Sequence, residues 1–150
     1  MVRLSNQKKW DRRFMELASQ VASWSKDPNT KVGAVIADED RRVCGVGYNG
    51  FPAGVVDRPE VLRDSETKHA CTIHAEVNAI HNSARTKGCT LYTTLAPCAQ
   101  CMAQIIQAGI VAVVYGGRHP NIDYTHTQQM SAESGVLLFA QTNYDKHPNA

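Results

Sequence analysis

The sequence predicts an α/β sandwich built on a five-stranded mixed sheet. Three observations lead to this fold class: a hairpin pattern in the N-terminal third, strand–helix alternation after it, and an almost wholly apolar strand at 110–115. Alternating strands and helices are typical of helices packed on a central sheet, and an apolar strand is typical of a sheet covered on both faces. With 150 residues, we expect one domain over 1–150 and no internal linker.

An amphipathic helix is expected over residues 6–24, with Ser5 as its N-cap. Its apolar residues recur at alternating spacings of four and three, which places them on one helix face. This stripe consists of Trp10, Phe14, Leu17, Val21 and Trp24. We therefore predict that the stripe is part of the core, and that residues 25–30, which contain Asp27-Pro28, form a loop.

Two strands, residues 32–37 and 42–48, flank a polar turn at 38–41 and predict a hairpin. Residues 49–68 follow as a long loop that is rich in charges and contains YNGFPAG at its start, from Tyr48 to Gly54. A loop this long in a compact domain is often functional, but a solvated insertion is the competing interpretation.

The rest of the chain alternates between strands and helices. Strands are expected at 90–94, 110–115 and 136–140, and helices at 72–86, 97–108 and 123–134. The first of these helices has its apolar side at Ile73, Val77 and Ile80, with Gly88 as its C-cap.

Turn residues fix the ends of the last two helices. Pro97 stands at the first position of one helix and Gly109 just past its end, which is the usual asymmetry of these two residues. Asp123 is a plausible cap for the last helix, and Gly135 is expected to end it. The polar tail at 141–150 is expected to be loosely ordered.

The composition excludes several classes of protein. The chain is 43% hydrophobic with a net charge of +2, which argues against disorder. Its longest apolar runs are far shorter than the ~20 residues of a membrane span, and residues 1–20 lack the continuous apolar stretch of a secretory signal. The same charge gives little attraction to a nucleic-acid polymer, so we expect a small-molecule partner and a cytoplasmic location. Five cysteines, an odd number, favour reduced thiols or a metal site over a disulfide framework.

Two cysteines have the spacing of metal ligands. Cys98 and Cys101, in Pro-Cys-Ala-Gln-Cys, stand three residues apart at the start of a predicted helix, so they share one face and can bind one metal ion. Thiolates suit zinc, and a helix N-terminus lowers the pKa of a thiol. A redox pair of thiols is the rival interpretation.

His74 and Glu76, in His-Ala-Glu, complete this constellation. Inside a regular helix, residues two apart point about 200° away from each other. At the helix entrance His74 need not obey that geometry, although a structural histidine is the alternative. One imidazole and two thiolates leave the fourth zinc position open, as in catalytic sites, and the carboxyl of Glu76 is then placed for general acid–base chemistry.

His-x-Glu followed by Pro-Cys-x-x-Cys resembles the signature of the zinc-dependent cytidine deaminase-like family. The resemblance covers about residues 5–140, and it implies a three-layer α/β/α sandwich. It extends to the deoxycytidylate deaminase branch through four segments of this sequence: DPNTKVGAVI at 27–36, GYNGFPAG at 47–54, HAEVNAI at 74–80 and LAPCAQC at 95–101. Of these, the GYNGFPAG segment is the most specific to that branch.

The resemblance implies a reaction and a set of roles. His74, Cys98 and Cys101 bind Zn²⁺, and Glu76 moves protons between the attacking water, N3 of cytosine and the leaving ammonia. The reaction converts dCMP to dUMP, the precursor of dTMP. The residues implied for substrate binding are Val32, Gly33, Ala34, Asn49 and Ala75, with Ser25, Lys26 and Arg118 as candidates for the 5′-phosphate.

The resemblance also implies regulation. Related enzymes are often hexamers that dCTP activates and dTTP inhibits, with Mg²⁺ on the nucleotide. The effector residues implied here are Tyr48, Asn49, Gly50, Gly54 and Asp57. The alternative is an unregulated enzyme that uses this loop only as a wall of the substrate site.

Three cysteines lie outside the motif, and two other functions remain open. Cys44, Cys71 and Cys89 are expected to be buried thiols, although His69 and Cys71 also allow a second, structural zinc. The first alternative function is deamination of cytidine, guanine or tRNA adenosine. Of these, a tRNA substrate would need a more basic surface with more aromatic side chains than this composition offers. The second is a catalytically silent zinc-binding module.

Overall fold

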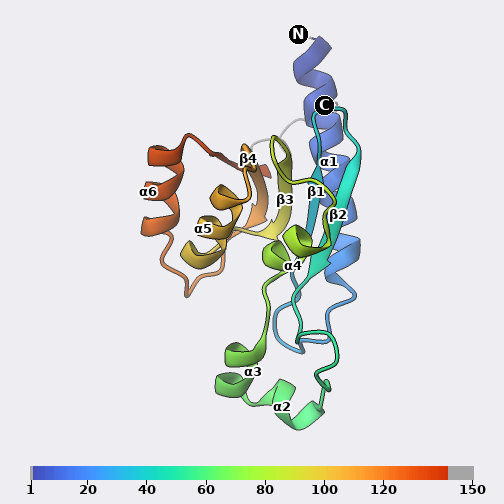
Figure 1. Ribbon diagram of the computed structural model, residues 1–150, viewed down its shortest axis with the longest axis vertical. Coiled ribbons are helices and arrows are strands. Elements are labelled where there is room, and N and C mark those ends of the chain that lie inside the picture. Colours follow the sequence, from blue (N-terminus) through green and yellow to red (C-terminus); the bar gives the residue numbers. More distant parts are fainter. Residues whose placement is uncertain (1, 142–150) are drawn as a thin grey trace.

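The computed structural model of the chain describes residues 2–141, with the side chains of residues 6–141. Five strands form one sheet in the order β2-β1-β3-β4-β5 (Figure 1). They are β1 Gly33–Ala37, β2 Val43–Tyr48, β3 Thr90–Leu95, β4 Ala112–Gly117 and β5 Leu137–Ala140. β1 runs antiparallel to β2 and β3, whereas β3, β4 and β5 are parallel. The predicted five-stranded mixed sheet is confirmed.

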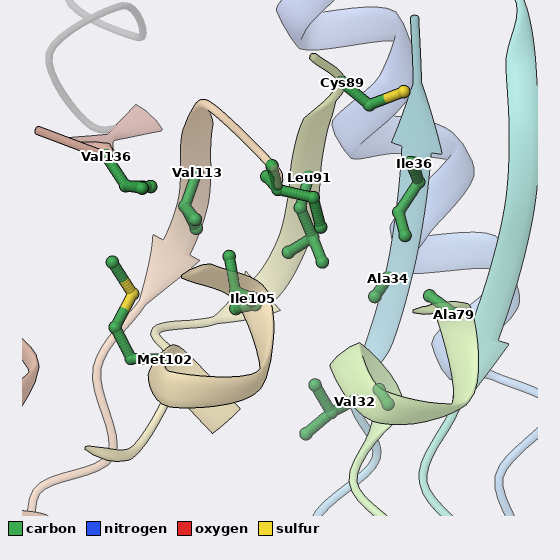
Figure 2. Close-up of a cluster of buried hydrophobic side chains, with 12 residues drawn as sticks. Val32, Ala34, Ile36, Ala79, Cys89, Leu91, Met102, Ile105, Val113 and Val136 are labelled. Carbon is green, nitrogen blue, oxygen red and sulfur yellow. The ribbon is translucent and has the colours of Figure 1, made fainter. Parts of the chain in front are cut away.

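Helices cover both faces of this sheet. They are α1 Val2–Ala22, α2 Pro59–Arg63, α3 Ser65–Cys71, α4 Ala75–Asn82, α5 Ala99–Gln107 and α6 Thr125–Ser134. α1 packs on one face through a cluster that includes Phe14, Met15 and Tyr92. α4 and α5 pack on the other face, where Ala79 and Ile105 join side chains of the sheet (Figure 2). The result is a three-layer α/β/α sandwich.

The first helix departs from its predicted bounds. It already includes residues 2–5, so Ser5 lies inside the helix and is not its N-cap. It ends at Ala22, where the N–H of Trp24 bonds to the carbonyl of Val21 in a tightened last turn. Trp24 therefore leaves the helical spacing of the apolar stripe and is 51% exposed, so its predicted place in the core is wrong.

The β1–β2 hairpin has the predicted form. Asp38 Oδ1 accepts the backbone N–H groups of Asp40 and Arg42, both at 2.9 Å, and Arg41 takes a left-handed φ of 63°. A carboxylate that binds backbone two and four residues ahead stabilises a tight turn.

Two glycines allow helices to lie unusually close to this hairpin. A Cβ on Gly33 would lie 2.0 Å from the carbonyl oxygen of Ala18 in α1. A Cβ on Gly47 would lie 2.2 Å from the backbone nitrogen of Ala79 in α4. The missing side chain of Gly33 therefore allows β1 to pack closely against α1.

The long segment after β2 contains more structure than predicted. Residues 49–68 were expected to be a loop, yet α2 and most of α3 lie within them. These short helices lie beyond the end of the sheet (Figure 1). Backbone hydrogen bonds between Gly50 and Ile73, at 2.8 and 3.1 Å, join the two ends of this segment. Within residues 2–141, no helix is long and apolar enough to cross a bilayer.

α4 is shorter than predicted and buries a different face. It ends at Asn82 with Ser83 as its C-cap, while Gly88 has a φ of 79° in the turn before β3. Its buried residues are Ala75, Glu76 and Ala79, whereas the predicted apolar side at Ile73, Val77 and Ile80 is only half-buried. The reason is the contact with Gly47, because a helix this close to a strand buries its small residues.

The ends of α5 and α6 follow the turn residues. Gly109 and Gly135 take φ values of 81° and 80° just past these helices, as predicted. Cys98, not Pro97, is the residue before the first turn of α5. Asp123 Oδ1 accepts the N–H of Thr125 at 2.9 Å, although Tyr124 occupies the N-cap position. The predicted loose tail lies, from residue 142 on, outside the described residues.

Candidate active site

The entrances of α4 and α5 hold the two sequence motifs. His74 is the N-cap of α4 with φ −69° and ψ 153°, and Cys98 is the N-cap of α5 with φ −67° and ψ 171°. Both backbones are extended, so neither side chain follows the helical rotation of its motif. The prediction that His74 stands outside helical geometry is confirmed, and this lets His74 and Glu76 serve one site.

Three side chains converge as a metal-binding set. His74 Nδ1 lies 3.1 Å from Cys101 Sγ and 3.6 Å from Cys98 Sγ, and the three donor atoms lie within 4.8 Å of one another. Among the described residues, no other group of three His, Cys, Asp or Glu side chains has this arrangement. One imidazole nitrogen and two sulfurs are ligands that zinc favours, so the residues present fit a zinc ion with one open position.

The two thiols differ in their readiness to ionise. A hydrogen bond from the Cys101 thiol lowers the pKa of Cys98 to about 4, and the same bond raises the pKa of Cys101. The hydrogen bond to Cys98 also raises the pKa of His74. The Cys98 thiol therefore ionises before the Cys101 thiol, and zinc would compete with the proton held by the Cys101 sulfur.

Glu76 lies beside this set without belonging to it. Its side chain is almost fully buried, and burial raises the pKa of its carboxyl. Thr93 Oγ1 lies 3.5 Å from Glu76 Oε1, while the same hydroxyl donates to the carbonyl of Leu95 at 2.8 Å. A hydrogen bond with the Cys101 thiol opposes the effect of burial on the pKa of Glu76. A buried carboxyl with a raised pKa is suited to exchange protons with a bound molecule.

A cavity of about 510 Å³ opens over these groups. It is lined by His74 and Cys98 of the metal-binding set, by Glu76, and by residues from other stretches of the chain. These are Asp27, Thr30, Val32, Asn49, His69, Thr72, Ala75, Leu95, Ala96, His119, Asn121 and Ile122. Of the residues expected to bind substrate, the cavity therefore includes Val32, Asn49 and Ala75.

Asn49 is fixed in the cavity wall by both ends of its amide. Its Oδ1 accepts the N–H of Val32 at 2.8 Å, and its Nδ2 donates to the carbonyl of Thr30 at 2.9 Å. Its backbone carbonyl accepts the hydroxyl of Ser25 at 2.8 Å. One amide hydrogen of Asn49 remains for a bound molecule.

Two of the expected base contacts lie away from the cavity. Gly33 donates its N–H to Thr94 Oγ1 at 3.1 Å, and its α-carbon faces α1. Ala34 is fully buried in the core between β2 and β3. The structure therefore brings Val32 to the cavity but not the two residues after it.

The three phosphate candidates are not among the cavity-lining residues. The Ser25 hydroxyl is buried and engaged by Asn49, and Lys26 forms an exposed ion pair with Asp57 at 2.9 Å. Arg118 donates to the hydroxyl of Tyr115 at 3.0 Å. Each of these three side chains already has a partner within the chain, so the lining of the cavity does not support their placement as phosphate ligands.

Sequence reasoning missed several cavity residues. Asp27 and Thr30 belong to the DPNTKVGAVI segment but were predicted only as loop residues, and Thr72, His119 and Asn121 carried no motif. One signal was available for His119: it follows β4 as Cys98 follows β3, and ligands of open α/β sheets bind beyond the carboxyl ends of neighbouring parallel strands.

The residues expected to bind an effector lie at the end of β2 and in the segment that follows it. Tyr48 is 40% exposed and meets the ring of Trp24 edge-on at 6.2 Å. Gly50 pairs with Ile73, directly before the metal-binding His74, and Gly54 has a φ of 88°. Asp57 holds Lys26.

The other cysteines do not form a second metal set within the described part of the chain. Cys44 is half-buried and Cys89 is buried, but Cys71 is exposed, so the expectation that all three are buried is wrong for Cys71. All five cysteines are free thiols.

The chain matches known families and proteins in sequence. Residues 8–117 match the family described as the cytidine and deoxycytidylate deaminase zinc-binding region. An uncharacterized deaminase in the luxG 3′ region of Aliivibrio fischeri is 47% identical over 106 residues, covering 70% of this chain and 71% of that protein. The deoxycytidylate deaminase of Homo sapiens is 42% identical over 113 residues, covering 71% of this chain but only 64% of the human protein.

Solved structures match in fold. The dCMP deaminase of cyanophage S-TIM5, in complex with dCMP and dUMP, superposes with a TM-score of 0.72 at 24% identity, covering 88% of this chain and 96% of the phage enzyme. A RibD structure from Acinetobacter baumannii gives a TM-score of 0.67 at 25% identity, and covers 92% of this chain but 36% of that protein. The α/β/α sandwich is therefore shared with both.

Proposed function

Because the chain belongs to the family of the cytidine and deoxycytidylate deaminase zinc-binding region, we propose that it hydrolyses dCMP to dUMP and ammonia. The mammalian relatives that carry the name deoxycytidylate deaminase support this substrate. The match covers less than two thirds of their length, so the proposal concerns the shared domain. The product is the precursor of dTMP, which places the reaction in pyrimidine nucleotide synthesis.

The observation that carries this proposal is that a metal-binding set and a separate carboxyl group lie side by side at one cavity. A three-donor zinc set at His74, Cys98 and Cys101 lies next to Glu76, a buried carboxyl that is not one of the donors. A structural zinc site would use a fourth protein ligand and would need no free acid beside it. A redox pair of thiols would explain neither His74 nor Glu76.

Each residue then has a defined task. Zinc, when bound by His74, Cys98 and Cys101, lowers the pKa of water and so supplies a nucleophile at neutral pH. Glu76 accepts the proton that the attacking water loses and delivers it to N3 of the cytosine ring. As the C4–N bond breaks, Glu76 transfers the second proton of that water to the amino group, which leaves as ammonia, and C4 keeps the oxygen.

The remaining cavity residues bind and orient the nucleotide. Val32 and Asn49 form a wall whose amide group is fixed and has one hydrogen left for the sugar. Thr30, His119 and Asn121 supply further polar groups in the same cavity, and we assign the 5′-phosphate to this group of residues. A reducing compartment such as the cytoplasm keeps the two ligand thiols available for zinc.

Ammonia release tests the proposal directly. The zinc-loaded chain is assayed with dCMP, CMP, deoxycytidine and cytosine, and we expect the highest kcat/KM for dCMP. No ammonia from dCMP, with or without dCTP and Mg²⁺, would refute the proposed function. A faster reaction with one of the other three substrates would keep the chemistry and change the substrate.

We further propose that dCTP with Mg²⁺ activates the enzyme, that dTTP inhibits it, and that the chain is a homo-oligomer, with a hexamer favoured. Support comes from the segment that connects the expected effector residues to the site, since Gly50 is hydrogen-bonded to the residue before His74. Sigmoidal dCMP kinetics that dCTP makes hyperbolic would support regulation, and light scattering would give the oligomer size. Identical kinetics with and without both effectors would refute it.

A further inference from the structure

A buried ion pair that plays no part in this chemistry lies beside the cavity. The ammonium of Lys68 in α3 is 3.1 Å from Oδ1 of Asp27, and their side chains are 4% and 11% exposed. Every other ion pair among the described residues has a partner that is at least 48% exposed. Relative to an apolar pair of the same size, a buried ion pair is a weak source of stability, which favours a role in geometry.

Asp27 organises the loop that forms one wall of the cavity. The same Oδ1 atom also accepts the N–H groups of Asn29 at 2.9 Å and Thr30 at 3.2 Å. Burial raises the pKa of Asp27, but these hydrogen bonds and the Lys68 ammonium outweigh it and lower the pKa overall. The carboxylate is therefore ionised, and it holds the backbone of Thr30 in place.

The hydrogen bonds continue from Thr30 to the substrate wall. The carbonyl of Thr30 accepts Asn49 Nδ2, and Asn49 Oδ1 accepts the N–H of Val32. Four consecutive links thus run from Lys68 through Asp27 and Thr30 to Asn49 and Val32.

The other side of the ion pair is anchored in the wall that holds the metal ligand. The carbonyl of Lys68 accepts both the N–H and the hydroxyl of Thr72, at 2.9 and 2.6 Å. Thr72 lines the cavity and stands two residues before His74. Lys68 therefore connects two walls of one cavity, although it is 41 positions from Asp27 in the sequence.

We propose that Asp27 and Lys68 are a positioning pair, which fixes Asn49 and Val32 relative to the wall of Thr72 and His74 and so sets the affinity for the substrate. The pair does not touch the reacting atoms, and the identity of the substrate rests on the proposed function. Losing the pair should weaken substrate binding and leave the chemical step nearly intact, because the hydrogen bonds of Asp27 and Lys68 do not include the zinc ligands or Glu76.

Two variants separate this role from folding. Lys68→Met removes the ammonium at similar volume, but it leaves a buried carboxylate unpaired and is expected to destabilise the fold. The double variant Asp27→Asn/Lys68→Met leaves no buried charge, and the amide oxygen can still accept the N–H groups of Asn29 and Thr30, although more weakly than the carboxylate does. The double variant should therefore fold well and still lack the link between the walls.

The control is an exposed ion pair of similar sequence separation. Arg85 and Glu39 are 46 residues apart and 2.9 Å from each other, with side chains 48% and 56% exposed. Neither residue lines the cavity. Glu39→Gln breaks this pair and should leave KM and kcat for dCMP within about twofold of the wild type.

For the double variant we expect KM for dCMP to rise about tenfold or more, kcat to stay within about threefold, and zinc to remain at one per chain. A wild-type KM in the double variant would overturn the proposal, because the pair would then act only by neutralising its own charges. A fall in kcat at constant KM would overturn it as well.

Amide hydrogen exchange tests the same pair without any substrate. The amides of Thr30 and Val32 should exchange faster in the zinc-loaded double variant and at the wild-type rate in Glu39→Gln. Unchanged exchange at both amides would overturn the proposal, whichever substrate the chain turns over. Faster exchange in the variant, together with no dCMP turnover by the wild type, would refute the proposed function and support the positioning pair.

Discussion

The two walls of the cavity are built in different ways. The metal wall comes from two short stretches, 74–76 and 98–101, that open two helices. The binding wall comes from residues 27–32 and Asn49, and hydrogen bonds between positions far apart in the sequence hold it together and join it to Lys68. The metal wall owes its geometry to local backbone conformation, and the binding wall owes it to the folded chain as a whole. Substitutions in the two walls should therefore fail in different ways.

The largest effect is expected from removing a metal ligand. Cys98→Ala should lose zinc, all measurable deamination and part of the thermal stability, because metal binding is coupled to folding. Zinc per chain and the melting temperature with and without added zinc measure this. Cys44→Ala, which removes a half-buried thiol outside the metal set, should keep one zinc. Stoichiometric zinc in Cys98→Ala would contradict the ligand assignment.

A change in the metal wall that spares the ligands should remove only catalysis. Glu76→Gln should keep zinc and the melting temperature, and should lower kcat by about 10²- to 10⁴-fold, since it removes the group that moves protons. Ammonia release and zinc content are measured together, with the exposed Glu133→Gln in α6 as the control. Wild-type activity in Glu76→Gln would disprove the assigned role.

The contact between α4 and β2 allows a test of whether the position of α4 controls catalysis by the metal wall. Gly47→Ala places a Cβ against the backbone of Ala79, so it should displace α4 and cost about 1–3 kcal/mol of unfolding free energy, with a lower kcat. Gly135→Ala is the control, because that glycine has a φ of 80° and no atom within 4 Å. It should cost about 1–2 kcal/mol from backbone strain alone and leave kcat unchanged. Equal kcat values in both variants would show that α4 tolerates the shift.

The smallest effect is expected on the unfolding free energy at low pH, through Asp27 in the binding wall. The pKa of Asp27 is lower in the folded chain than in the unfolded one, so its contribution to stability is complete above the unfolded pKa of about 4. That contribution is lost as the pH falls through the lowered folded pKa.

Urea unfolding of the wild type and Asp27→Asn measures this difference. The difference in unfolding free energy should be constant between pH 5 and 7 and should shrink below about pH 4. Asp40→Asn, an exposed residue of the hairpin turn, serves as the control. A difference that grows toward acid would contradict the assignment of Asp27.

The same contrast explains what could be predicted from the sequence. The order of strands and helices, the turn at 38–41 and the glycines after α5 and α6 depend on residues close in the sequence, and these predictions are confirmed. The motif spacing likewise identified the three metal ligands that the structure brings together.

The failures involve contacts between distant segments. The buried face of α4 is set by Gly47 in β2, which no periodicity within residues 72–86 reveals. The partners of Ser25 and Lys26, which are Asn49 and Asp57, lie 24 and 31 residues away and could not be foreseen from the local sequence, while the phosphate role of these two residues stays a prediction. The ion pair of Asp27 and Lys68 could not be predicted either, because these residues are 41 positions apart in the sequence.

The exposed position of Trp24 makes it a built-in fluorescence probe. The sequence has two tryptophans, and Trp10 lies half-buried with the Arg13 guanidinium 4.7 Å from its ring. Trp24 is instead exposed to solvent, and its ring lies edge-on to the ring of Tyr48. Tyr48 is the first residue of the segment expected to bind the effector nucleotides. In a Trp10→Phe protein, Trp24 would be the sole indole emitter. Its fluorescence would then follow movement of that segment in real time, without an attached dye.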